Sequence, residues 1–374
     1  MSVVKLFLGE YTVFHALTLT VAAFVVLAGC SRSGTESASQ EPAQATPAKE
    51  LIFNTYLPPG EAMRRNAVED FSRRIEQESG GSIKIVIPDS TLAPSNRQWS
   101  VVTDGVADFA LVATYAQREQ MPLPLIADLP FNSISGESAS TALWSTYKKY
   151  FESVNEFADV QLLSMYAMPP YNFISNAKPI SKIDDFKGVK IWVSAGAPTD
   201  TVKALGGVPV YSPFPQLFEY ASKGNVDAVM VGPGTVKQAS IGDHVKYMSR
   251  IAGGFGAASF AIIMNKDTWA SLSAEEQAAV MRAADGLPQR VGRALDERNR
   301  LALEELKLTV NDIDASVVSE VQKRVAPIEA TWIAEAQQRG LANAAEALAF
   351  YRSEMAAAAQ AVQVTAQPAT PPAN

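Results

Sequence analysis

The sequence is poor in the residues that form disulfides, bind metals or transfer protons. It has one cysteine, Cys30, and two histidines in 374 residues. A single cysteine excludes a disulfide within the chain. Beyond residue 30 the only histidine is His244, and G-x-S-x-G, H-E-x-x-H and P-loop motifs are absent. We therefore expect a protein that is not an enzyme and uses no metal or cofactor.

Positive charge is also scarce. Lys and Arg total 32 against 39 Asp and Glu, a net charge of -7. Proteins that bind nucleic acid usually present a basic face, so we expect no nucleic-acid partner. The hydrophobic content of 47% is enough for a globular core. At roughly 150 residues per domain, the length favours two domains plus additional segments.

Charge is missing altogether from residues 11–29. This apolar stretch ends in Leu27-Ala28-Gly29-Cys30, which resembles the lipoprotein box of bacteria, where the cysteine is lipidated and cleavage occurs just before it. We predict a signal peptide over 1–29 and a lipid anchor at Cys30. The alternative is an uncleaved transmembrane helix, because ~19 apolar residues nearly span a bilayer. By the same resemblance, an aspartate after the cysteine would retain the protein in the inner membrane. Because Ser31 stands there, the sequence does not decide between anchoring in the inner and in the outer membrane.

Two segments lack the apolar residues of a core. Residues 30–50 are small, polar and contain proline, and we predict a disordered tether there. Residues 356–374 are rich in Ala, Gln and Pro and are predicted to be a disordered tail. The folded body is therefore expected to cover about 51–355.

Strand-like and helix-like stretches alternate along this body, which predicts an α/β fold. The helical stretch that begins at Ser273 has the capping pattern S-x-x-E and runs toward Leu306, with a kink expected at Pro288. The predicted strands are 51–56, 82–87, 109–113, 162–168, 189–194, 208–211, 228–231 and 259–264. The predicted helices are 61–78, 98–104, 199–205, 214–222, 273–306 and about 319–355.

A set of short motifs occurs in one order along the body. Each motif alone is an ordinary turn or helix start, but together, from about 52 to 330, they resemble the solute-binding proteins of TRAP transporters. The motifs are YLPPG at 56–60, GGSIKI at 80–85, DGVADF at 104–109, LPF at 129–131, SNAKPI at 175–180, DDFKGVKI at 184–191, LGGVPV at 205–210, GNVDA at 224–228, NKDTW at 265–269 and LSAEEQ at 272–277.

The resemblance implies a two-lobe periplasmic-binding-protein-like α/β fold with hinge strands and a long kinked helix spanning both lobes. Lobe I would comprise 51–170 plus about 283–318, and lobe II 171–282 plus about 319–355. A small organic ligand would bind between the lobes, which close around it. The closed form would deliver it to the small and large TRAP membrane subunits. A periplasmic, lipid-anchored protein is implied; the alternative is a ligand-sensing lipoprotein on the same fold that feeds a signalling partner.

By the resemblance, the polar contacts with which family members hold a carboxylate are replaced in this sequence. The usual clamping arginine falls on Trp192, a second arginine on Tyr171, and an asparagine near Ala257. A buried carboxylate without a cation is unfavourable by several kcal/mol. Either the ligand is an acid held by Arg97, or it is aromatic, neutral or cationic. The predicted ligand-binding residues are Tyr56, Arg97, Tyr115, Tyr171, Trp192, Phe214 and Phe255. Core packing for the aromatic residues and a surface position for Arg97 are the alternatives.

Overall fold

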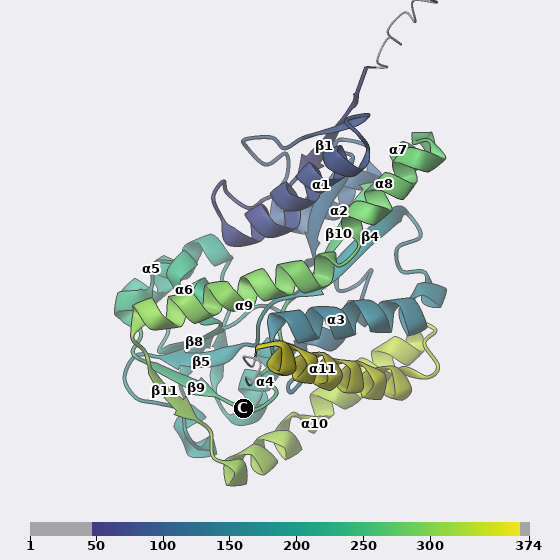
Figure 1. Ribbon diagram of the computed structural model, residues 1–374. Helices are drawn as coiled ribbons and strands as arrows, with labels where there is room; N and C mark the ends of the chain where they lie inside the picture. The colour runs from purple at the N-terminus through teal and green to yellow at the C-terminus, as the bar shows by residue number, and fades with distance from the viewer. Residues whose placement is uncertain (1–46, 367–374) are drawn as a thin grey trace, which may run out of the picture. The chain divides into compact units, whose positions relative to one another are not determined.

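The computed structural model describes residues 47–366, whose strands form two sheets (Figure 1). The predicted signal peptide, Cys30 and nearly all of the tether lie outside the described residues. The first sheet has the strand order β2-β1-β3-β10-β4. Its strands are β1 (Lys49–Asn54), β2 (Ile83–Val86), β3 (Phe109–Ala113), β4 (Val160–Ala167) and β10 (Ser259–Asn265).

Parallel and antiparallel pairing are both used in the first sheet. β1 runs parallel to β2 and β3, and β10 lies antiparallel between β3 and β4. All five residues of β3 are buried, as expected for a continuous apolar run at the centre of a sheet covered on both faces.

The second sheet has the strand order β11-β9-β5-β8-β6-β7. β8 is parallel to β6, which is parallel to β7, while β5 is antiparallel to both β8 and β9. Its strands are β5 (Asn172–Ser175), β6 (Lys190–Trp192), β7 (Val208–Val210), β8 (Ala228–Val231), β9 (Tyr247–Arg250) and β11 (Thr309–Asp312). We call the two sheets with their covering helices the first and the second lobe.

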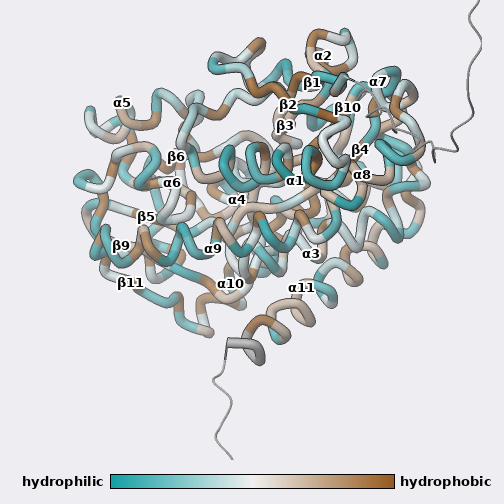
Figure 2. The backbone as a smooth tube through the Cα atoms, turned by 45° about the horizontal axis from the view of Figure 1, so that its top comes forward, coloured by the Kyte–Doolittle hydropathy of each residue, from teal (hydrophilic) through white to brown (hydrophobic). Residues whose placement is uncertain are grey.

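Helices cover both faces of the first sheet. One face packs against α1 (Asp70–Glu78) and α8 (Ala274–Ala284), with Phe71, Ile75 and Val280 in the shared core. The other face is covered by α3 (Gly136–Thr146) and α11 (Ala344–Ala366), which lie side by side in Figure 1. Figure 2 shows hydrophilic residues recurring along the turns of α1 and of α9 (Leu287–Leu306), as in helices with one buried side.

The remaining helices are shorter connections or lie at the periphery, apart from α10, which packs against α4. They are α2 (Gln98–Thr103), α4 (Ala197–Leu205), α5 (Leu217–Ser222), α6 (Pro233–Gln238), α7 (Lys266–Ser271) and α10 (Ala315–Gln338). Among the helices of residues 47–366, none combines the length and apolar character of a membrane span.

The long helix predicted from Ser273 to Leu306 is divided in two. α8 ends at Ala284, and α9 (Leu287–Leu306) starts after Gly286, whose φ of 64° is left-handed. Pro288 lies in the first turn of α9, where its missing N–H is not needed. The predicted single helix with a kink is therefore two separate helices. α9 contacts α3 and β4 in the first lobe and α6 in the second, so it spans both lobes as expected.

The strand pairing differs from the predicted division of the chain between the lobes. Residues 259–265, assigned from sequence to lobe II, form β10 inside the first sheet, and residues 309–312, assigned to lobe I, form β11 in the second. The tail prediction is wrong for 356–366, because α11 continues to Ala366. Tyr351 and Met355, buried in the core beneath this helix, anchor it.

Candidate functional site

Two stretches of chain cross between the lobes side by side. One links β4 to β5 and the other links β9 to β10. Backbone hydrogen bonds join them, from Met168 N–H to the Ala258 carbonyl at 2.8 Å and from Tyr171 N–H to the Gly256 carbonyl at 2.8 Å. With α9 as a third connection, the lobes are linked by paired extended segments that can bend, which is the geometry of a hinge.

Aromatic hydroxyls gather where the first lobe meets this hinge. Tyr56 follows β1 and Tyr115 follows β3, and both lie half-buried on the first core. Tyr115 meets Phe260 edge to face at 6.5 Å, and Phe260 stacks on Tyr166 at 5.5 Å. Burial raises the pKa of Tyr115 to about 12, with Asp128 and Tyr211 adding to the effect. These phenols are therefore neutral hydrogen-bond donors at physiological pH.

Tyr171 belongs to the hinge and lies near Tyr115. Its side chain is buried, and its hydroxyl hydrogen-bonds to Ser194, which follows β6. Burial, and secondarily the nearby Asp128 carboxyl, raise the pKa of Tyr171. Tyr115 from the first lobe and Tyr171 from the hinge thus both face Asp128. The predicted residues Tyr56, Tyr115 and Tyr171 are brought together by the fold.

Asp128 is a buried carboxyl that the sequence analysis did not single out. It is 2% exposed, and its Oδ1 has no hydrogen-bond partner in the described part of the chain. Burial raises its pKa well above the usual range, and the charge of Arg118 opposes this only in part. Burial thus favours the protonated, neutral form of this carboxyl, which would add one more neutral hydroxyl to the tyrosine group.

Trp192 lies at the end of β6 with its indole in the core of the second lobe. The side chain is 6% exposed and packs among residues such as Leu217 and Val229. Its Nε1 donates to Ser212 Oγ at 3.0 Å, and Phe214 meets the ring edge to face at 6.5 Å. Packing within the lobe accounts for these contacts, so a ligand contact by Trp192 or Phe214 stays a prediction.

Phe255 and Arg97 lie apart from the tyrosines. Phe255 has no exposed surface and packs against Phe173 at 4.5 Å, which favours the core alternative for this ring. Arg97 is exposed at the end of the turn Ser95–Arg97, and among residues 47–366 its guanidinium has no ion pair. Its role as a ligand cation remains a prediction.

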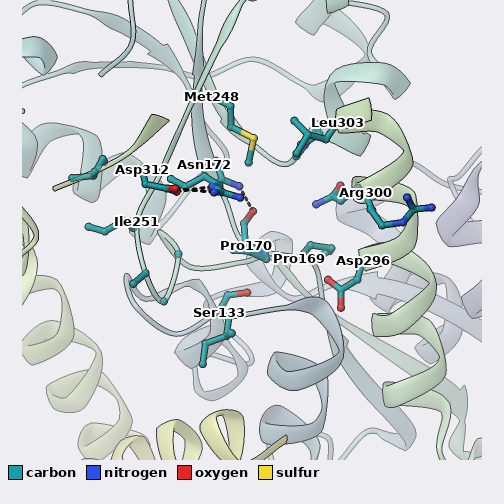
Figure 3. A pocket seen from close by; sticks show the side chains of 18 residues that line it. Ser133, Pro169, Pro170, Asn172, Met248, Ile251, Asp296, Arg300, Leu303 and Asp312 are labelled. Carbon is teal, nitrogen blue, oxygen red and sulfur yellow. Dashed lines mark hydrogen bonds and ion pairs between the residues drawn. The ribbon is translucent and has the colours of Figure 1, made fainter. Parts of the chain in front are cut away.

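A cavity of about 670 Å³ lies beside the hinge, between α9 and the second sheet (Figure 3). None of the predicted ligand-binding residues lines it. Arg250 forms a bidentate ion pair with Asp312 at 2.8 and 2.9 Å on one side. Across the cavity in Figure 3, α9 presents Asp296 and Leu303 toward Asn172 and Met248. The cavity is thus a feature of the outer side of the hinge, separate from the tyrosine group.

His244 is half-buried in the second lobe and contacts the ring of Phe218 at 6.0 Å. No group of three or more His, Cys, Asp and Glu among residues 47–366 is arranged to hold a metal ion. Two α/β lobes joined by paired hinge segments, with neutral hydroxyls at the junction, define a hinged receptor for a small solute.

The family model described as bacterial extracellular solute-binding protein, family 7, matches residues 53–338. The chain belongs to this family, and the proteins of the family with solved structures include TRAP periplasmic solute-binding proteins. The resemblance seen in the sequence motifs is thereby confirmed. The chain is a TRAP-type extracytoplasmic solute-binding protein, and its mixed α/β architecture matches theirs.

Three relatives illustrate the match. The outer membrane transporter protein TsaT of Comamonas testosteroni is 31% identical over 317 residues, 82% of this chain and 92% of that protein. A TRAP solute-binding protein of Bordetella bronchiseptica, solved with bound (R)- and (S)-mandelate, is 28% identical with a TM-score of 0.76, covering 82% of this chain and 99% of that one. One from Rhodoferax ferrireducens, solved with copurified benzoate, is 23% identical with a TM-score of 0.75, covering 84% and 99%.

Three residues of the junction escaped the sequence analysis: Glu61, Tyr166 and Arg298. Tyr166 lies in an apolar strand and Arg298 in the charged run Asp296-Glu297-Arg298, so neither stands out from its neighbours. They lie close together because α9 packs against β4. Only the packing of the two elements could reveal them.

Proposed function

We propose that this receptor captures a small aromatic acid between its two lobes and delivers it to TRAP membrane subunits. The observation that carries the proposal is the group of tyrosines at the hinge, Tyr56, Tyr115, Tyr166 and Tyr171. Their rings offer flat apolar surface for an aromatic ring, and their neutral hydroxyls offer donors for an acidic group. Mandelate in the Bordetella bronchiseptica relative is a ligand of this chemical class.

Trp192, which stands where family members have the clamping arginine, restricts which residues can hold the acidic group of the ligand. Because an indole cannot hold a carboxylate in a bidentate way, the acidic group must meet another donor set. Arg97 is the cation expected from the sequence, while a neutral or cationic aromatic ligand would need none. Trp192 and Phe214 would then contribute to the apolar wall on the side of the second lobe.

The mature protein would act at the membrane and not by catalysis. We propose lipid attachment at Cys30, with residues 31–46 as a tether that lets the folded body reach the small and large permease subunits. Energy for transport would come from the permease, and the receptor itself would turn over no substrate. A signalling partner, the alternative considered from sequence, gains no support from the relatives, which are transport proteins.

A thermal-shift comparison of matched ligands tests this proposal. Mandelate and benzoate should raise the melting temperature of the purified protein, because a ligand at about 100 times its Kd adds about 2.7 kcal/mol of stability. C4-dicarboxylates should raise it little. A larger shift with dicarboxylates, or with aromatic amines and amides than with the acids, would contradict an aromatic acid as the ligand.

A further inference from the structure

Arg298 on α9 is placed where the two lobes and the spanning helix meet. Its side chain is 16% exposed. Nη1 donates to Glu61 Oε1 at 3.0 Å in the first lobe and lies 3.5 Å from Gln238 Oε1 on α6 in the second. Burial lowers the pKa of Arg298, and the Glu61 carboxylate opposes this. The guanidinium nevertheless stays charged, because arginine is not deprotonated in proteins.

One edge of this guanidinium is unused. Nε and Nη2 of Arg298 are buried and have no hydrogen-bond partner in the described part of the chain. Three other arginines, Arg250, Arg293 and Arg300, each use these same two nitrogens to hold one carboxylate, at distances between 2.6 and 3.0 Å. The corresponding edge of Arg298 has the fork geometry that carboxylates fit in a bidentate way.

A third hydrogen-bond donor without a partner lies near Arg298. The hydroxyl of Tyr166 is also buried without a partner in residues 47–366. Burial and the nearby Glu61 raise the pKa of Tyr166, and Arg298 acts on the same hydroxyl in the opposite direction, so the three groups are neighbours. Tyr56 lies close to both Tyr166 and Glu61. Leaving a buried donor unpaired is unfavourable, and more so for a charged group than for a neutral one.

We propose that the Nε and Nη2 edge of Arg298, together with the Tyr166 hydroxyl, holds the acidic group of the ligand. This inference rests on the proposed function and assigns the cation that replaces the arginine missing at Trp192. Arg298 suits the task better than Arg97, because it is already buried and its remaining nitrogen is fixed by Glu61. The ring of the ligand would then lie toward Tyr56 and Tyr115.

The first test compares an acid with its amide. Arg298→Lys keeps the charge but removes the fork, so calorimetry should show binding of mandelate or benzoate weakened at least tenfold, with mandelamide or benzamide affected less than twofold. Arg290→Lys is the matched control: it lies on the same helix and also has an unpartnered Nε, but it contacts the first lobe only. It should leave both affinities unchanged.

Tyr166→Phe provides a second test that does not depend on charge. Because the hydroxyl has no partner, its removal should leave the melting temperature of the unliganded protein unchanged or slightly raised. Affinity for the acid should nevertheless fall several-fold. If Tyr166 served the structure alone, the substitution would lower the melting temperature and leave the affinity for the acid unchanged.

The outcomes separate this inference from the proposed function. If the wild-type protein binds no aromatic acid, the proposed function fails. If it binds the acids, but Arg298→Lys keeps full affinity or weakens acid and amide equally, the proposed function stands and the assignment of Arg298 is wrong.

Discussion

At the scale of single residues, Trp192 shows the core packing that the sequence analysis set against a contact with the ligand. Its indole is buried in the second core and its Nε1 is fixed by Ser212. Trp192→Ala should therefore lower the free energy of unfolding by about 3 kcal/mol or more, as for other buried aromatic residues, measured by urea denaturation. Weaker binding of aromatic acids is expected as well, and calorimetry measures it.

Trp269→Ala is the comparison for this variant. Trp269 packs half-buried on the first core, in α7, so its loss should reduce stability while leaving affinity intact. If Trp192→Ala also binds the acid with wild-type affinity, the indole serves the core alone.

Glu156 predicts a specific pH dependence of stability. Its carboxylate is 3% exposed, receives the Leu123 N–H at 3.4 Å and lies 3.8 Å from Arg339. Burial raises its pKa to about 8 from the ordinary 4.5. The folded state therefore binds a proton that the unfolded state has lost, so this group's contribution is complete below pH 4.5 and disappears as the pH rises through about 8.

Glu156→Gln should remove this part of the pH dependence. The variant has the same shape and no charge, so it should be more stable than wild type at pH 8, by roughly 4 kcal/mol, and equal to it near pH 4. Urea midpoints across this range measure the difference. A constant difference between the two proteins at every pH would contradict the shifted pKa.

The residue scale also shows what sequence alone can predict of the site. Tyr56, Tyr115 and Tyr171 were found because they occupy positions next to recognisable motifs. Arg298 and Tyr166 were missed because the sequence of a charged helix or an apolar strand does not indicate which polar side chain will lack a hydrogen-bond partner. Unsatisfied donors are a property of the packed structure, and no local pattern encodes them.

At the scale of elements, α9 depends on close contact with α3. A Cβ added to Gly292 would lie 2.5 Å from the Gly136 carbonyl and 2.6 Å from Glu137 Cα, both backbone atoms that cannot yield easily. Gly292→Ala should therefore push the helices apart and reduce stability by several kcal/mol, although alanine favours helix in itself. Thermal and urea denaturation measure the loss.

Gly80→Ala separates this contact from backbone strain. Gly80 has a φ of 61° and no atom within 4 Å of an added Cβ. Its substitution should cost only about 1 kcal/mol, through the left-handed conformation. Equal losses for the two variants would show that helix contact does not limit Gly292.

The elements predicted from sequence were those with strong periodicity. The strands at 109–113 and 228–231 were placed within the bounds found in the structure, because both are continuous apolar runs. β5, β9 and β11 were missed, because each mixes polar and apolar residues in a short stretch and depends on its neighbours for pairing. α3 was missed because its sequence, GESASTALWST, has weak periodicity and is stabilised by tertiary packing.

At the scale of the whole molecule, ligand binding should bring the lobes together. The hinge segments and α9 leave the lobes free to rotate while restricting other motions. Fluorescent labels on cysteines at Leu92 in the first lobe and Phe218 in the second, both exposed, should show higher energy transfer when mandelate is added, with Cys30 replaced by serine.

Labels at Leu92 and Val106 give the reference for this measurement. Both positions are exposed and belong to the first lobe, so their energy transfer should not respond to ligand. If transfer between Leu92 and Phe218 is equally insensitive while calorimetry reports binding, the receptor is closed before the ligand arrives.

The place of β10 in the first sheet has a consequence for biogenesis. This strand lies between β3 and β4, yet it is synthesised about a hundred residues after β4, when most of the second lobe already exists. The amino-terminal half of the polypeptide consequently cannot complete its own sheet as it emerges. The first sheet must wait for residue 265 and the second for residue 312, so neither lobe can be produced as an independent contiguous fragment.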